Sequence, residues 1–303
     1  MAAGRQSEDA RPHRLRFSVP LPPGFSFDAV VRSHGWYDLP PFAYDRGRAV
    51  LGIVGAGGAI TFRDAPGRLD VSGPGGRAAL SRIARRVFSL DLDLAAFDAL
   101  LVDAPALRRA LARGGGRMLR APTLFEDAVK MLLTTNCSWA ATQGMVVRLI
   151  ELAGEGGAFP TPAAIARIRP ATLRSRVRCG YRAPALSRFA RRVDSGRLDL
   201  SVWEDGDTPA ERVREAILGE DGFGPYAAEG LLRILGRHEF FAVDSWVRMK
   251  YRRMYPGRAK VERAIARRYA RFGAYRGLAL WLDLTRDWHE RDAPSWDGGE
   301  KSR

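Results

Sequence analysis

Two glycines and a later aspartate have the spacing in this sequence that best suits a chemical task. Gly222 and Gly224 flank a single phenylalanine between two stretches of helical periodicity, which predicts a tight turn between two helices. A Gly-x-Gly turn lets the backbone approach a phosphate, because no Cβ stands in the way. Asp244 follows Gly224 by twenty positions, just before a helical pattern at 245–254. That placement suits a helix N-cap and would hold a carboxylate at a fixed, partly buried position.

A fixed carboxylate is useful when bond breaking leaves positive charge on a sugar. It stabilises an oxocarbenium-like state electrostatically, and it can orient or deprotonate an attacking water. In a nucleic acid, only a base swung out of the stack reaches such a group. Two plainer interpretations stay open at this point: the glycines merely allow an ordinary helical hairpin, and Asp244 merely caps a helix.

The charge balance favours a polyanionic partner. The 303-residue chain has 49 Lys and Arg against 34 Asp and Glu, which gives a formal charge of +15. Such a field attracts nucleic acid and adds a large salt-dependent contribution to binding. An anionic membrane is the weaker alternative, because no segment has the basic amphipathic pattern of an interfacial helix. No apolar stretch reaches the roughly 18 residues of a membrane span.

Few side chains are suited to hold a cofactor. Cys137 and Cys179 are too few for a four-cysteine iron–sulfur cluster and have no zinc spacing. The four histidines are scattered along the chain, so a histidine-based metal centre has no support. We therefore expect no metal site and no cofactor.

The hydrophobic pattern changes once along the chain. As far as about Val71, short apolar runs alternate with Pro and Gly, which predicts a small antiparallel sheet with a helix near 27–34. From residue 77 the period is helical, which predicts a bundle of about ten short helices. The expected fold class is therefore mainly α (α+β). We expect a disordered tail at 1–13 and an N-terminal antiparallel β/α domain at 14–76. A helical domain follows at 77–290, and a polar tail at 291–303.

Two capping boxes predict where helices begin. Thr123 with Glu126 opens one helix, and Thr208 with Glu211 opens another.

Further segments of the chain resemble the helix-hairpin-helix (HhH-GPD) DNA glycosylase superfamily, in the branch of 8-oxoguanine DNA glycosylase and bacterial 3-methyladenine DNA glycosylase II. The similarity runs from about Leu80 to Trp288. Besides the hairpin and Asp244, five segments carry it in the same order: Arg85–Asp91, Arg117–Glu126, Thr134–Leu149, Cys179–Arg182 and Tyr269–Leu280. The resemblance implies a helical bundle of two lobes flanking a cleft for DNA and the flipped base, with the small β-sheet domain at its N-terminus.

The resemblance also implies roles for single side chains. Asp244 is the catalytic candidate, Asn136 would fill the gap left by the flipped base, and Tyr181 would be the wedge beside it. Contacts to DNA are expected from Gly222, Gly224, Asn136, Tyr181, Arg182 and Arg248. The expected base pocket consists of Tyr226, Phe272, Tyr275 and Trp281. The plainer alternatives are a helix cap, a surface aromatic, solvated arginines and ordinary core rings.

The departures from the family pattern bear on the reaction. Bifunctional members carry a Schiff-base lysine two residues after the second hairpin glycine, where this chain has Tyr226. Without an amine no imine to the sugar can form. Lys250 follows Asp244 by six positions and should point elsewhere on its helix. Ala141 stands where the 8-oxoguanine enzymes have one of two arginines that contact the orphaned cytosine.

We therefore expect a base-excision DNA repair glycosylase that flips a damaged base from duplex DNA and hydrolyses its N-glycosidic bond. An aromatic wall suits a cationic alkylated purine, so the expectation is a monofunctional enzyme of the 3-methyladenine type without lyase activity. The alternatives are an 8-oxoguanine-type DNA glycosylase and a catalytically silent DNA-binding protein. The resemblance leaves open whether the hairpin binds a monovalent cation. The expected partner is double-stranded DNA containing a damaged base. We expect the protein to bind it as a monomer and to have no membrane partner. We expect a cytoplasmic, nucleoid-associated protein if the source is bacterial.

Overall fold

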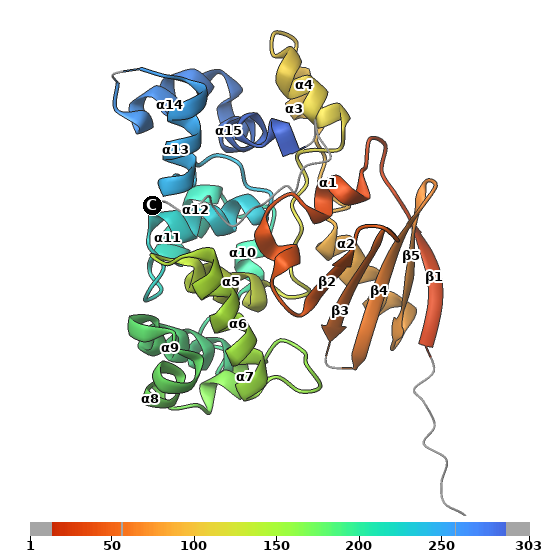
Figure 1. The fold of residues 1–303 in the computed structure, drawn as a ribbon, viewed down its shortest axis with the longest axis vertical. Coiled ribbons are helices and arrows are strands. Elements are labelled where there is room, and N and C mark those ends of the chain that lie inside the picture. Colours follow the sequence, from red (N-terminus) through yellow and green to blue (C-terminus); the bar gives the residue numbers. More distant parts are fainter. Residues whose placement is uncertain (1–13, 56, 258, 289–303) are drawn as a thin grey trace, which may run out of the picture.

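A computed structural model describes residues 14–55, 57–257 and 259–288, and it has a small sheet against one side of a larger helical body (Figure 1). The mainly α (α+β) architecture predicted from the sequence is confirmed. The two predicted polar tails, 1–13 and 291–303, lie outside the described residues.

The N-terminal sheet has five antiparallel strands in the order β1-β5-β4-β3-β2. Their bounds are β1 (Arg14–Pro20), β2 (Phe42–Asp45), β3 (Val50–Gly55), β4 (Gly58–Ala65) and β5 (Arg68–Pro74). The ring of Phe88, at the end of α2 (Arg77–Val87), lies 5.2 Å from the rings of Phe27 in α1 (Phe27–Val31) and Phe62 in β4. These three rings join both helices to the sheet. The sequence does not predict β2, because four residues are too few to show an alternating pattern.

The helical body consists of more elements than the ten that the periodicity predicts. Its further helices are α3 (Ala95–Ala99), α4 (Pro105–Ala112), α5 (Leu124–Thr134), α6 (Trp139–Ala153), α7 (Pro162–Ala166), α8 (Pro170–Thr172), α9 (Ala183–Asp194), α10 (Ser201–Glu204), α11 (Ala210–Leu218), α12 (Pro225–Ile234), α13 (Ser245–Met254), α14 (Val261–Tyr269) and α15 (Arg276–Leu284). Four of them, α3, α7, α8 and α10, have three to five residues. Helices this short carry too few apolar positions to show a period.

Of the two predicted capping boxes, the one at Thr123 forms its N-cap bond, while the Glu126 carboxylate pairs with Lys130 at 2.6 Å. The Thr123 side chain accepts a hydrogen bond from the backbone N–H of Glu126 at 3.2 Å, as predicted. The prediction at Thr208 is wrong, since α11 begins at Ala210 without a side-chain cap. The Thr208 hydroxyl instead donates to the carboxylate of Asp205 at 2.8 Å.

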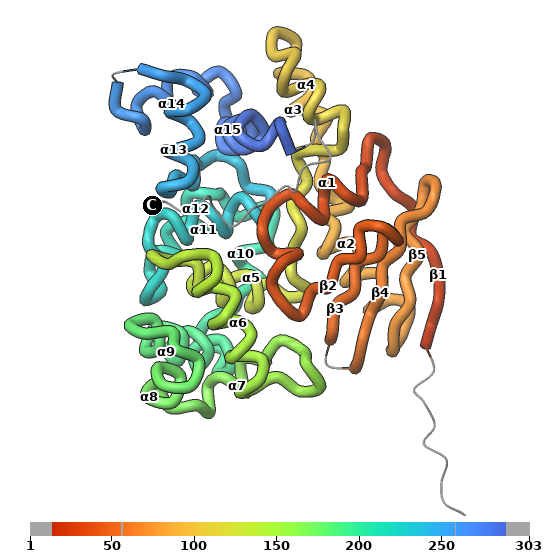
Figure 2. The backbone as a smooth tube through the Cα atoms, in the orientation of Figure 1, coloured from red at the N-terminus to blue at the C-terminus, as the bar shows by residue number. Residues whose placement is uncertain are grey.

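Two hydrophobic cores organise the chain. The first contains apolar side chains of the sheet together with α2, α5, α6, α9, α11 and α12. The second contains those of α3, α4, α13, α14 and α15. Figure 2 shows α12 between the green segment of α5 to α9 and the blue segment of α13 to α15. The expected boundary between residues 76 and 77 falls between β5 and α2, although the first core includes side chains from both sides of it.

Candidate active site and nucleic-acid interface

The helical hairpin forms between α11 and α12, and its two glycines have different surroundings. Gly222 has a φ of +85°, and a Cβ added there would lie 2.8 Å from Ala185 Cβ and Leu132 Cδ1. Gly224 is the N-cap of α12 with a φ of −84°, and a Cβ there would meet nothing within 4 Å. Gly222 therefore fits the hairpin onto α5 and α9, while Gly224 leaves open space at the helix N-terminus. Phe223 is buried between them, as predicted.

Asp244 is the N-cap of α13, as the sequence predicts. Its Oδ1 accepts a hydrogen bond of 2.7 Å from the backbone N–H of Val247. Within the described part of the chain, Oδ2 accepts no hydrogen bond. One carboxylate oxygen thus fixes the group to the helix, and the other is left for chemistry.

Tyr226 and Arg233 lie seven residues apart on one face of α12. Asp244, at the start of α13, is near enough for its charge to act on both side chains. Burial raises the pKa of Tyr226 to about 12, and the negative charge of Asp244 is the second cause. The phenol is therefore protonated at neutral pH. Burial lowers the pKa of Arg233, while Tyr226 and Asp244 act in the opposite direction. An arginine so placed still carries its positive charge near neutral pH.

Trp281 comes to this group from α15. The Arg233 guanidinium carbon lies 3.9 Å from the centroid of the Trp281 ring, in the geometry of a cation–π contact. The Trp281 indole N–H donates to the backbone carbonyl of Ser33 at 3.1 Å. Tyr226 packs against the first core and Trp281 belongs to the second. The group of Asp244, Tyr226, Arg233 and Trp281 thus lies where the two cores meet.

The other two predicted pocket residues lie elsewhere in the second core. Phe272 is buried, with the ring of Phe97 at a centroid distance of 6.4 Å. The Tyr275 ring lies 5.5 Å from the Phe97 ring and 6.3 Å from the ring of His238. The structure therefore brings Tyr226 and Trp281 together around Arg233 and sets Phe272 among core rings.

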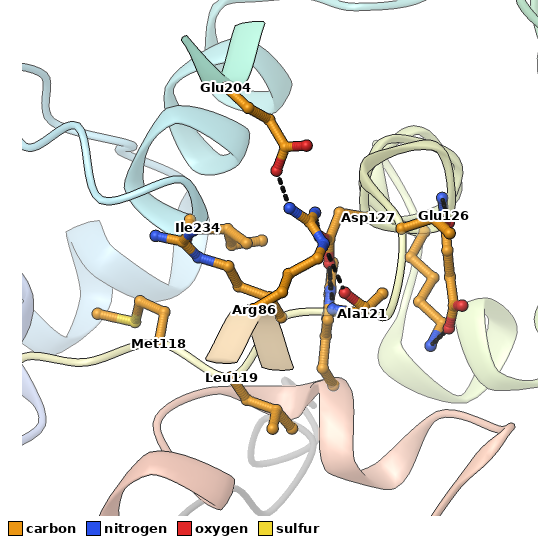
Figure 3. Close-up of polar contacts among 12 residues, drawn as sticks. Arg86, Met118, Leu119, Ala121, Glu126, Asp127, Glu204 and Ile234 are labelled. Carbon is orange, nitrogen blue, oxygen red and sulfur yellow. Dashed lines mark hydrogen bonds and ion pairs between the residues drawn. The ribbon is translucent and has the colours of Figure 1, made fainter. Parts of the chain in front are cut away.

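Buried polar contacts fix the far end of α12 (Figure 3). Arg86 donates to the carboxylate of Asp127 at 2.7 Å and to the carbonyl of Ala121 at 2.9 Å. Arg120, next along the chain to Ala121, donates to the carbonyl of Ile234 at 2.7 Å. The segment before α5 is thus held by α2 and α5 and in turn holds the last turn of α12, the turn that also carries Arg233.

The same segment supports Trp281 from the opposite side. The backbone N–H of Leu119 donates to the Ser33 hydroxyl at 2.9 Å, and its carbonyl accepts from His34 Nε2 at 2.8 Å. Ser33 offers its own carbonyl to Trp281. Burial lowers the pKa of His34 to about 3, so the ring is neutral and adds no charge to the site.

Asn136 and Tyr181, the predicted gap-filling and wedge residues, meet although they are far apart in sequence. The Asn136 amide donates a hydrogen bond of 3.1 Å to the Tyr181 hydroxyl. Asn136 has a φ of +47°, a left-handed conformation that asparagine tolerates better than most residues. The Tyr181 ring is 61% exposed, so a large aromatic surface faces solvent.

Arg182 is turned inward beneath this pair. Its Nε donates to Thr135 Oγ1 at 3.1 Å, a second nitrogen donates to the Thr135 carbonyl, and its guanidinium carbon lies 4.6 Å from the Tyr181 ring centroid. The side chain is buried. Arg182 therefore joins the loop before α6 to the loop before α9 and holds Tyr181 in place.

The two predicted basic groups on α13 are both paired. Arg248 Nε donates to Glu262 at 2.7 Å on the exposed surface. Lys250 donates to Asp287 at 2.7 Å, which agrees with the prediction that it points away from Asp244. Arg248 as a phosphate contact stays a prediction.

Sequence reasoning missed Arg233, Ser33, His34 and His238. Only Arg233 carries a usable signal, because it follows Tyr226 by seven positions on the second helix of the hairpin. The other three reach the site through tertiary contacts that no local pattern records.

No helix within residues 14–55, 57–257 and 259–288 has both the length and the apolarity to cross a membrane. The same residues include no group of three His, Cys, Asp or Glu side chains suited to a metal ion. The absence of a cofactor and the cation at the hairpin stay untested expectations.

Comparisons with known proteins agree with this architecture. A family model described as "HhH-GPD superfamily base excision DNA repair protein" matches residues 129–272. A probable N-glycosylase/DNA lyase of Methanothermobacter thermautotrophicus is 24% identical over 230 residues, which are 64% of this chain and 72% of the relative.

Solved structures match over most of the chain. MBOgg1 in complex with a low-affinity DNA ligand has a TM-score of 0.72 at 19% identity and covers 91% of this chain and 96% of its own. The 8-oxoguanine glycosylase/lyase of Clostridium acetobutylicum has a TM-score of 0.68 at 18% identity, with 86% and 93% covered. The 3-methyladenine DNA glycosylase of Archaeoglobus fulgidus has a TM-score of 0.68 at 21% identity, with 90% and 98% covered. At these identities the structures establish a shared fold. The family match places residues 129–272 in the HhH-GPD superfamily of base excision DNA repair proteins, and the whole described chain shares the fold of these solved DNA glycosylases.

Proposed function

We propose that this chain is a monofunctional DNA glycosylase, which hydrolyses the N-glycosidic bond of a damaged base flipped from duplex DNA and leaves the sugar–phosphate strand intact. The observation that carries the proposal is that Asp244 lies near Tyr226. A carboxylate with one oxygen fixed and the other available lies near a protonated phenol at the position where the bifunctional relatives have their amine.

No lysine in the described part of the chain offers an amine in place of the one that Tyr226 lacks. Lys130 is buried and pairs with Glu126 at 2.6 Å, and Lys250 pairs with Asp287. Lys260 is exposed and directly precedes α14, and Lys301 lies outside the described residues. A phenol forms no imine, so the strand-cleaving step loses its usual agent.

Hydrolysis needs little beyond these groups. As the bond between C1′ and the base nitrogen breaks, positive charge develops on the sugar, and the Asp244 carboxylate stabilises it electrostatically. The free oxygen of Asp244 can accept a hydrogen bond from the attacking water and take its proton. The Tyr226 phenol is neutral, so it does not compete with Asp244 as a base.

Two further features of the structure suit DNA binding. The open N-terminus of α12 at Gly224 suits a backbone phosphate. The joined side chains of Asn136 and Tyr181 present an exposed amide and ring that suit the gap in a duplex from which a base has left. The proposed partner is double-stranded DNA with a damaged base, bound by a monomer, and the proposed location in a bacterial cell is the nucleoid.

Two classes of damaged base suit the site for different reasons. The aromatic rings of Tyr226 and Trp281 support an alkylated purine of the 3-methyladenine type, which stacks as a cation on such rings. The Arg233 cation over Trp281 favours an uncharged base, as for the 8-oxoguanine-type relatives. The relatives named above include both types.

The test is base release with and without alkali. Wild type and Asp244→Asn would be incubated with duplexes containing 7-methylguanine, hypoxanthine, uracil or 8-oxoguanine, and each reaction divided between alkali and no alkali. Strand breaks that appear only after alkali, and only with the wild type, are the expected result. Breaks without alkali would indicate lyase activity. If neither protein releases a base while both bind DNA, the chain is a silent binding protein.

A further inference from the structure

Arg233 has no polar partner in the part of the chain that the structure describes. Its guanidinium has five N–H donors, which form no hydrogen bond or ion pair with the described residues, and its guanidinium carbon lies over the Trp281 ring. Other arginines in this region are engaged: Arg120 binds the Ile234 carbonyl at 2.7 Å, and Arg214 of α11 binds Glu229 of α12 at 2.8 Å. Arg233 is half-buried, so its unused donors lie in a partly dry environment.

The surroundings of Arg233 hold a single negative charge. Asp244 is near enough to influence Arg233, but it forms no ion pair with it. His34 and His238 are both buried and neutral, because burial lowers the pKa of each to about 3 and the Arg233 charge acts in the same direction. Among the residues that the structure describes, neither ring nitrogen of His238 has a hydrogen-bond partner. Arg233 therefore lies among the Asp244 carboxylate, aromatic rings and neutral imidazoles, and the other nearby cations, Arg120 and Lys130, are engaged with the Ile234 carbonyl and with Glu126.

Charge conservation during base release distinguishes two classes of substrate. When the C1′–N bond of a neutral base breaks, its electron pair stays on the base, which leaves as an anion. When a cationic N-alkylated base leaves, the same electron pair neutralises it, and no negative charge develops. A preorganised cation beside the leaving base stabilises only the first kind of transition state.

We propose that Arg233 is a catalytic residue that contacts the flipped base, donates hydrogen bonds to an exocyclic oxygen, and stabilises the negative charge of the departing base. This inference rests on the proposed glycosylase function and deepens it. The substrates it selects are uncharged bases that carry a carbonyl, such as deaminated or oxidised bases. Water supplies the oxygen that bonds to C1′, Asp244 takes the proton of that water, and the base anion is protonated by solvent on release.

The same geometry disfavours a cationic base. A positively charged purine stacked near Trp281 would meet a guanidinium that already lies 3.9 Å from that ring. Like charges in a partly desolvated site repel strongly, because little water screens them. Arg233 thus acts both as a donor for one class of base and as a barrier to the other.

The experiment measures single-turnover release of hypoxanthine and 8-oxoguanine, which are neutral, and of 7-methylguanine, which is cationic. Three variants are compared with the wild type. Arg233→Gln removes the charge and keeps an amide, Arg233→Lys keeps the charge, and Arg16→Gln removes an exposed arginine from the distant edge strand β1 as the matched control. Thermal unfolding of each variant verifies that it is folded.

The expected result is faster release of a neutral base by the wild type, and a loss of about 100-fold in that release with Arg233→Gln. Release of 7-methylguanine should stay unchanged or rise in the same variant, and Arg233→Lys should keep the preference for neutral bases. Equal losses for both classes of base, or a wild-type preference for 7-methylguanine, would overturn the inference about Arg233. The proposed glycosylase function would still stand. If the wild type releases none of the three bases, the proposed function fails and the inference fails with it.

Discussion

The amide of Asn136 donates a hydrogen bond of 3.1 Å to the hydroxyl of Tyr181, forty-five positions further along the chain. Arg182 completes the arrangement from below by binding Thr135 and covering the Tyr181 ring. Two side chains for which the sequence suggests separate tasks are therefore parts of one unit. If Asn136 and Tyr181 have the proposed gap-filling and wedge roles, they should act together.

Removal of the Tyr181 hydroxyl tests this coupling. Tyr181→Phe keeps the ring and loses one hydrogen bond at an exposed site, worth about 1 kcal/mol, so base flipping should slow by about fivefold. Stopped-flow fluorescence of 2-aminopurine placed next to the lesion would follow the flipping step. Asn136→Ala should give a similar loss, and the double variant should lose little more than either single one. Losses that simply multiply would mean that the two residues act independently.

The sequence predicts those parts of the site that depend on neighbouring residues. The cap at Asp244, the hairpin around Phe223 and the helix start at Thr123 are all formed by contacts within three positions. A type of residue followed closely by its partner is enough to predict each of them. The sign of the total charge likewise needs no structure.

The environment of Arg233 could not be predicted in this way. It depends on Trp281, forty-eight positions away, whose indole is oriented by Ser33 near the N-terminus. The aromatic residues suggest a wall for a cationic base, and the sequence does not reveal that a cation already lies on one of those rings. The failed prediction at Thr208 has a different origin, because there a local contact, the bond from the Thr208 hydroxyl to Asp205, forms in place of the expected cap.

Asp244→Asn should separate catalysis from folding. Asparagine caps helices about as well as aspartate, so the free energy of unfolding should change by less than about 0.5 kcal/mol. Base release should fall at least about 100-fold, because the fixed negative charge is lost. Asp244→Ala would lose the cap as well and should cost about 1 kcal/mol of stability, measured by urea unfolding. A destabilised Asn variant would mean that the charge itself supports the fold.

The two hairpin glycines should respond differently to alanine. Gly222→Ala introduces a Cβ 2.8 Å from two side-chain carbons at a φ of +85°, so it should destabilise the protein by about 1–3 kcal/mol. Gly224→Ala meets no atom within 4 Å at an ordinary φ, so it should cost less, at most about 1 kcal/mol from the poorer N-cap. Its added methyl would stand at the helix N-terminus and should weaken DNA binding. Thermal unfolding and fluorescence anisotropy with duplex DNA measure the two effects, and a Gly224→Ala protein that binds normally would contradict the role of this turn.

Stability should fall below neutral pH because His34 and His238 are buried as neutral rings. Their pKa values are lowered from 6.5 to about 3, chiefly by burial, so the unfolded chain binds protons between these limits and the folded chain does not. The free energy of unfolding should therefore be greatest above pH 6.5 and decrease as the pH falls, by up to about 1.4 kcal/mol per pH unit for each histidine. Urea unfolding at pH 7, 6 and 5 measures the slope.

The variant His238→Gln isolates one of the two contributions, since glutamine does not titrate. Comparison with the wild type is needed because burial raises the pKa of Glu126 and Asp127, and their protonation opposes the effect of the histidines as the pH falls. We expect the variant to lose less stability than the wild type between pH 6 and pH 5, whatever its stability at pH 7. Parallel slopes in the two proteins would show that His238 binds its proton in the folded state, as an exposed histidine does, and would place that ring in contact with water.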